Sequence, residues 1–109
     1  MAGELGSAGP VRKIAGTWLR ELPQRLDDLD AASRHRDAER LRGGAHTLKS
    51  TCALIGADAA AKLASDIERR AADGDAAGPE QVDGLRAAAE AAAARVHDWI
   101  RRLPPEAAP

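Results

Sequence analysis

His46 and Lys49 are the residues of this sequence whose types and spacing are best suited to chemistry. Residues three positions apart lie on neighbouring positions of one helix face. A neutral imidazole is a good nucleophile near pH 7, because the unperturbed pKa of histidine is about 6.5. A lysine one turn away would attract a negative group attached to that imidazole. The pair is therefore suited to carrying an anionic group such as phosphoryl on His46.

The helix that must position this pair is predicted over residues 37–54. Its apolar residues recur at steps of three and four, which is the period of one buried helix face; they are Leu41, Ala45, Leu48, Cys52 and Ile55. At about 100° per residue, His46 lies roughly 140° from the centre of this stripe and should face solvent. Small and cationic residues share its exposed side, namely Arg42, Gly43, Ser50 and Ala53. A partner surface could therefore approach the imidazole closely, and we predict partner binding by these four residues.

Three further helices are predicted from the same periodicity, over residues 11–32, 58–72 and 79–103. In the helix over 11–32, the residues expected to face inward are Val11, Ile14, Trp18, Leu22, Leu26 and Leu29. In the helix over 58–72 they are Ala60, Leu63, Ala64, Ile67 and Ala71. In the helix over 79–103 they are Val82, Leu85, Ala89, Ala92, Val96, Ile100 and Leu103. Pro23 is expected to kink the first helix without ending it. Gly43-Gly44 is expected to let the site helix fray or bend.

The elements together predict an all-α fold, an antiparallel up-down four-helix bundle, because no alternating strand pattern is present and the connections are short. At 109 residues the chain is long enough for one compact domain. We assign residues 11–103 to the bundle, residues 1–10 to a flexible N-terminal lead-in and residues 104–109 to a C-terminal tail.

Composition excludes several classes of function. A net charge of −1 does not favour nucleic acid as a partner, and no apolar run is long enough to span a membrane. Cys52 is the only cysteine and the N-terminus lacks the pattern of a secretory signal, so a cytoplasmic protein is expected. The chain is also expected to be monomeric. Cys52 falls on the core stripe, and His35 and His97 are expected to be surface residues. Trp18 and Trp99 are expected to be packing residues, although Trp99, at the edge of its stripe, could touch a neighbouring chain.

The run Ala45-His46-Thr47-Leu48-Lys49-Ser50, followed by Gly56-Ala57, Leu63 and Ile67-Glu68, resembles the signature of histidine-containing phosphotransfer (HPt) domains. That signature is commonly A-H-x-L-K-G, then G-A, L and L-E. Ser50 departs from it, since the family more often has glycine there. The close resemblance spans Leu41 to Glu68, and Glu68 is expected to have a structural role.

The resemblance implies a phosphohistidine carrier in a phosphorelay. His46 would accept a phosphoryl group from the aspartate of a receiver domain or from a hybrid sensor histidine kinase, and would pass it to a response regulator. Lys49 would favour the phosphoryl charge and orient the receiver. Mg²⁺ would come from the receiver, so that this chain would bind no cofactor or metal and would have no kinase activity of its own.

Small helical bundles also serve other functions. A helical adaptor that docks on receivers or kinases without being phosphorylated remains open. A di-iron bundle enzyme needs inward Glu-x-x-His pairs, which this chain lacks. A histidine kinase dimerisation domain typically has an acidic residue and a Thr-Pro step after its histidine, which Thr47-Leu48-Lys49 does not match.

Overall fold

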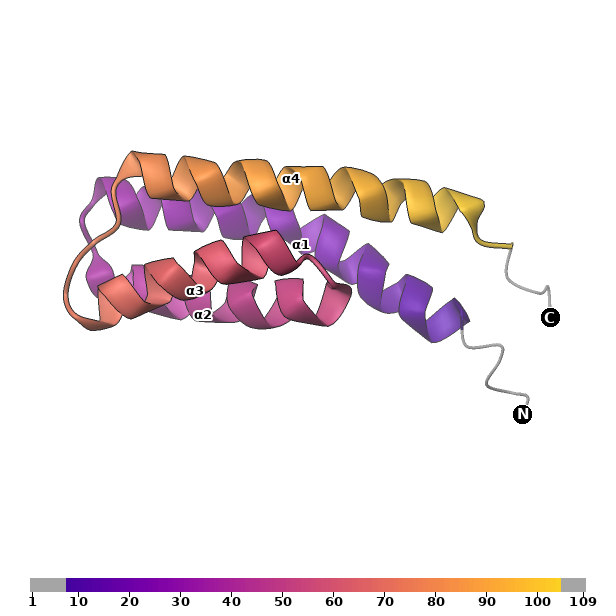
Figure 1. The fold of residues 1–109 in the computed structure, drawn as a ribbon, viewed down its shortest axis with the longest axis horizontal. Coiled ribbons are helices and arrows are strands. Elements are labelled where there is room, and N and C mark those ends of the chain that lie inside the picture. Colours follow the sequence, from indigo (N-terminus) through magenta and orange to yellow (C-terminus); the bar gives the residue numbers. More distant parts are fainter. Residues whose placement is uncertain (1–7, 105–109) are drawn as a thin grey trace.

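A computed structural model describes residues 8–104 of the chain, which form four helices joined by short connections (Figure 1). The helices are α1 (Ala8–Arg34), α2 (Ala38–Ile55), α3 (Asp58–Ala72) and α4 (Pro79–Arg102). Neighbours in sequence run in opposite directions, and the α2–α3 hairpin packs against α1 and α4 (Figure 1). The predicted antiparallel all-α bundle is confirmed, and the helix limits lie within three residues of the predicted ones. None of the four helices combines the length and apolar character that crossing a bilayer requires.

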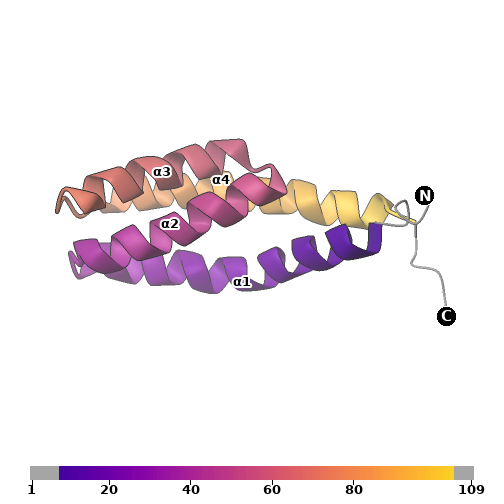
Figure 2. The ribbon, with the colours of Figure 1, turned by 90° about the horizontal axis from the view of Figure 1, so that it is seen from below.

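Helix α1 begins earlier than the sequence pattern indicated. Ala8, Gly9 and Pro10 were assigned to the lead-in, but they form its first turn. Proline is tolerated there because the first backbone N–H groups of a helix have no partner within it. Residues 1–7 and 105–109 lie outside the described residues. Pro23 lies inside the helix without ending it, and α1 changes direction near its middle (Figures 1 and 2).

Helix α2 is well defined at both ends. The Asp37 side chain, just before the first helical residue, accepts a hydrogen bond of 3.1 Å from the backbone N–H of Arg40. Gly56 follows the last residue with φ of 83°, a left-handed conformation that glycine adopts at little cost. The helix is continuous through Gly43 and Gly44, so the expected fraying is not seen.

The core is built from the predicted apolar stripes. Its largest fully buried side chains are Leu26, Leu29, Leu41, Leu48, Ile67, Leu85, Val82 and Cys52. Burial raises the pKa of the Cys52 thiol, as expected for a core cysteine that plays no part in nucleophilic chemistry. The predictions for α2 and α3 hold closely, with Ile55 and Leu63 only partly buried at the edge of the core.

The outer ends of α1 and α4 differ from the prediction. Val11 and Ile14 belong to the apolar stripe of α1, yet they are 44% and 47% exposed. Helices α1 and α4 have 27 and 24 residues, whereas α2 and α3 have only 18 and 15. The longer pair therefore projects beyond the turn of the α2–α3 hairpin, where the hairpin no longer covers it (Figures 1 and 2). Ile100 and Leu103, predicted to be buried, are half-buried for the same reason.

One buried hydrogen bond holds the opposite end of the bundle together. The Ser33 hydroxyl, in the last turn of α1, donates a hydrogen bond of 2.6 Å to the backbone carbonyl of Ala77. Ala77 lies in the connection between α3 and α4, far away in the sequence. This bond satisfies the only polar side chain that is buried within residues 9–104, and it fixes the long connection against α1.

The two adjacent glycines of α2 should respond differently to substitution. A Cβ added at Gly43 meets nothing within 4 Å, whereas one at Gly44 lies 3.3 Å from Cδ2 of Leu29. Alanine is favoured over glycine inside a helix by about 1 kcal/mol. We therefore expect Gly43→Ala to raise the free energy of unfolding in urea by up to about 1 kcal/mol. Gly44→Ala should gain clearly less, and an equal gain from both would contradict the close contact with α1.

Candidate functional site

His46 projects from the middle of α2 into solvent. Its neighbour Ala45 and the next stripe residue, Leu48, are fully buried, which fixes the rotation of the helix about its axis. The His46 side chain is 61% exposed, as the stripe predicted. The imidazole is therefore open to a partner while its backbone is held in the core.

The ring of His46 is oriented by a carboxylate from the neighbouring helix. Nδ1 of His46 lies 2.8 Å from Oε2 of Glu68, which projects from α3 and is only 20% exposed. An ionised carboxylate can only accept hydrogen bonds, so the ring nitrogen facing it carries the hydrogen. In the neutral imidazole, the lone pair then lies on Nε2. Glu68 thereby favours the tautomer in which Nε2 carries the lone pair and faces away from the carboxylate.

The same carboxylate also holds Lys49. Nζ of Lys49 lies 2.7 Å from Oε1 of Glu68, so that each carboxylate oxygen serves one partner. The hydrogen bond from Lys49, followed by that from His46, lowers the pKa of Glu68 below the ordinary glutamate value. Glu68 is consequently ionised near neutral pH, where its acceptor role requires it. The structure thus brings His46 and Lys49 together through a third residue.

The four residues predicted to bind a partner all lie on the exposed surface of α2: Arg42, Gly43, Ser50 and Ala53. Arg42 forms an ion pair of 2.7 Å with Glu39 on its own helix. The hydrogen bond and charge of Glu39 raise the pKa of Arg42. The other three are small, which leaves the surface beside His46 sterically open. Whether these residues bind a partner stays a prediction.

Glu68 is the member of the site whose contribution the sequence did not predict. It was expected to have only a structural role, but it contacts both residues singled out for chemistry. It lies 22 positions after His46 on a different helix, so no helical spacing links the two. The only signal was its place in the Ile67-Glu68 step of the family signature.

The remaining candidates lie apart from this site. His35 follows α1 and His97 lies on α4, and both are exposed, as predicted. Within residues 8–104, no cluster of three or more His, Cys, Asp or Glu side chains is arranged to hold a metal ion.

Comparison with protein-family models matches residues 13–98 to the Hpt domain. The match covers most of the chain and includes His46, Lys49 and Glu68. No curated protein and no solved structure matched the chain.

The lowered pKa of Glu68 predicts how pH changes the stability contributed by its charge. A carboxylate whose pKa is lower in the folded state stabilises that state fully above the ordinary pKa of about 4.3. This stabilisation is lost as pH falls through the lowered value. We expect Glu68→Gln to reduce the free energy of unfolding by about 1 kcal/mol or less at pH 7. The difference from the wild type should shrink towards pH 3 in urea titrations.

The matched control is Glu39→Gln, which removes an exposed carboxylate paired only with Arg42 on its own helix. We expect a smaller effect at pH 7 than for Glu68→Gln. A difference between the wild type and Glu68→Gln that grew towards acidic pH would contradict the charge pairing described for Glu68.

Proposed function

The chain belongs to the Hpt domain family, and we propose that it is a phosphohistidine carrier whose acceptor is His46. Hpt domains act in phosphotransfer in two-component signalling, where they interact with receiver domains and histidine kinases. His46 would receive the phosphoryl group from the phosphoaspartate of a receiver domain or from a hybrid sensor histidine kinase. It would then pass the group to a response regulator. The observation that supports it best is the exposed imidazole held through Nδ1 by Glu68.

The transfer follows from the tautomer that Glu68 selects. The Nε2 lone pair of His46 attacks the phosphorus of the receiver's aspartyl phosphate, forming an N–P bond. The acyl P–O bond breaks, and the aspartate leaves as a carboxylate. In the onward step, an aspartate of the next receiver attacks the same phosphorus and His46 leaves through Nε2. No proton has to leave Nε2 in either direction, because Nδ1 carries the ring hydrogen throughout.

Glu68 also offsets the charge that develops on the ring. As Nε2 donates its lone pair, the imidazole gains positive charge, and the Nδ1–H group becomes a stronger donor to the carboxylate 2.8 Å away. Glu68 lies on the opposite side of the ring from Nε2, where the phosphoryl group is attached. Its negative charge therefore stabilises the ring while staying as far as the ring allows from the phosphoryl oxygens.

Lys49 provides the positive charge near the phosphoryl group. Its ammonium group is held by Glu68, yet the side chain is partly exposed and has the flexible stem that lysine brings. An exposed ion pair of this kind is worth at most about 1 kcal/mol, so that a phosphoryl dianion can compete for the ammonium. We propose that Lys49 turns towards the phosphoryl group when His46 is modified.

The remaining chemistry is assigned to the partner. We propose that the receiver supplies Mg²⁺ and the acidic pocket around its aspartate, and that this chain has no kinase activity of its own. This chain would contribute the open surface on which the receiver docks, formed by Gly43, Ser50 and Ala53, with Arg42 at its border. A receiver with an acidic active site could approach His46 over these small residues.

Phosphorylation of His46 can be tested directly. The protein is incubated with a radiolabelled phosphorylated receiver and Mg²⁺, and the label on the chain is tested for stability in acid and in base. We expect acid-labile, base-stable label that His46→Gln abolishes. His35→Gln and His97→Gln are the controls, and both should retain it. Label that persists in His46→Gln would refute the proposal, and docking on the receiver without any label would favour the adaptor.

The role of Glu68 as a positioning residue gives a second test. Glu68→Ala removes the acceptor of Nδ1–H, and we expect the phosphotransfer rate to fall about 10-fold to 100-fold, the loss typical when a partner that orients a metal-binding histidine is removed. Glu68→Gln keeps an oxygen acceptor and should lose less. The ¹⁵N chemical shifts of His46 should show Nδ1–H in the wild type and mixed tautomers in Glu68→Ala.

Glu39→Ala is the matched control, because it removes an exposed carboxylate from α2 that does not contact His46. It should leave both the rate and the tautomer unchanged. A normal rate in Glu68→Ala, together with an unchanged ¹⁵N spectrum, would show that Glu68 does not orient the ring.

A further inference from the structure

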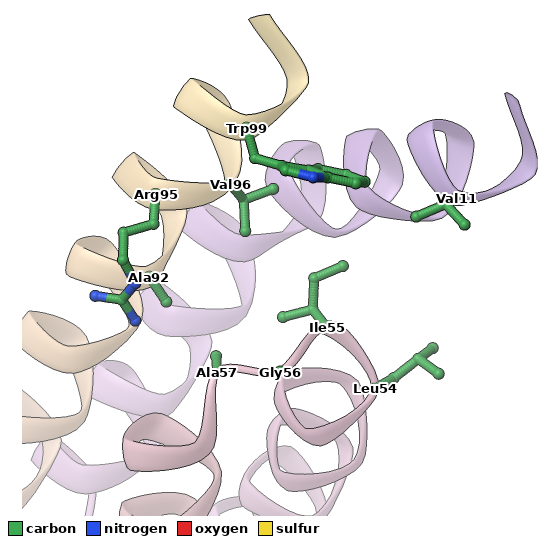
Figure 3. A pocket seen from close by; sticks show the side chains of 9 residues that line it. All are labelled: Val11, Leu54, Ile55, Gly56, Ala57, Ala92, Arg95, Val96 and Trp99. Atoms are coloured by element: carbon green, nitrogen blue, oxygen red, sulfur yellow. The ribbon is translucent and has the colours of Figure 1, made fainter. Parts of the chain in front are cut away.

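An apolar cleft lies at the end of the bundle where α1 and α4 project beyond the α2–α3 hairpin. Its volume is about 380 Å³. Side chains from three helices line it, among them Val11, Leu54, Ile55, Arg95, Val96 and Trp99 (Figure 3). A second groove of about 260 Å³ between α1 and α2 shares Leu54 and Ile55 with it. We call the larger hollow the end cleft.

The large apolar side chains that are exposed in the described part of the chain gather at this end. They are Val11, Ile14, Leu54 and Trp99, with Leu54 71% exposed. Val11 and Ile14 continue the stripe that is buried farther along α1, so their sequence pattern is that of core residues. Both remain exposed, although Ile14 lines the second groove together with Thr51 and Leu54 of α2. Clustered apolar exposure of this kind marks an interaction surface.

The charge around the end cleft indicates what kind of surface would cover it. Segments 8–20 and 95–104, which include the projecting ends of α1 and α4, contain six cations and one anion. The cations are Arg12, Lys13, Arg20, Arg95, Arg101 and Arg102, and the anion is Asp98. Asp98 pairs with both Arg101 and Arg102, whereas Arg95 and Lys13 have no ion-pair partner among the described residues. These two described segments therefore have an excess of cations, although the whole chain has a net charge of −1 and Glu21 lines the second groove beside Lys13.

We propose that the end cleft docks an acidic amphipathic helix of a partner protein. The apolar side of such a helix would contact Leu54 and Trp99, with one side chain entering the hollow between α4 and the hairpin. Its carboxylates would meet Arg95 on one side and Lys13 on the other. Helices bind grooves in this way through apolar residues spaced three and four apart.

Charge and shape favour an acidic helix over a second copy of this chain or an anionic membrane as the occupant of the end cleft. Two copies meeting through this end would bring their basic segments together, which opposes self-association. An anionic bilayer would match the charge, but a hollow accepts a protruding side chain better than a flat surface does. Leu54 follows His46 by eight residues, which is about 12 Å along α2. The end cleft therefore adjoins the open surface at Ala53 but does not include His46, and the proposal does not depend on phosphorylation of His46.

A designed peptide provides the probe. It has about 18 residues, with leucine at steps of three and four and glutamate at most other positions. Binding is followed by tryptophan fluorescence, because Trp99 is 37% exposed whereas Trp18 is already buried. We expect a blue shift on binding and an affinity that falls as salt rises. Arg95→Glu and Leu54→Ser should each weaken binding at least fivefold, whereas His46→Gln should not change it.

Lys62→Glu is the control for charge alone, since Lys62 is an exposed cation on α3 outside the end cleft. It should retain near wild-type affinity. The proposal is overturned if the peptide does not bind, if a scrambled or lysine-for-glutamate peptide binds equally well, or if Arg95→Glu has no more effect than Lys62→Glu. Sedimentation as a dimer that Leu54→Ser disrupts would assign the cleft to a second copy instead. Binding to anionic vesicles that Leu54→Ser abolishes would assign it to a membrane.

Discussion

The carboxylate of Glu68 is the interaction on which the site depends, because its two oxygens tie α3 to two residues of α2. One oxygen accepts from Nδ1 of His46 and the other binds Nζ of Lys49. An exposed histidine on an isolated helix would rotate freely and exchange its ring hydrogen between the two nitrogens. Here the ring has one orientation and one outward nitrogen. The carboxylate gives this selectivity without occupying the face that a partner must approach.

This arrangement requires α2 and α3 to lie close together, and the sequence provides for that. The contact between them is the most extensive in the bundle. Several of the buried positions on these helices are alanines, including Ala45 on α2 and Ala60 and Ala64 on α3, and small side chains let helices approach closely. The turn between the helices is only two residues long and begins with Gly56 in a left-handed conformation. A short turn fixes the register of α3 against α2, and this register places Glu68 beside His46.

Sequence periodicity predicted the four helices and the outward direction of His46, since both follow from which residues must be buried. It could not predict the contact of Glu68, because that depends on the register between two helices and not on spacing within one. It was wrong about Val11 and Ile14 for a related reason. Periodicity shows which face of a helix is apolar, but whether that face is covered depends on the lengths of the neighbouring helices. The short hairpin leaves the end of a core stripe exposed.

The different lengths of the helices divide the molecule into two regions. In the middle of the bundle all four helices pack against one another, and there the core holds His46 at the surface. The end formed by α1 and α4 lacks the other half of a bundle, so its apolar side chains remain available for contact. An added helix of opposite charge would complete the core pattern already present in α1 and α4. Helix α2 contains both His46 and Leu54. Partner binding at the end cleft and phosphoryl transfer at the imidazole would therefore involve different residues of one helix.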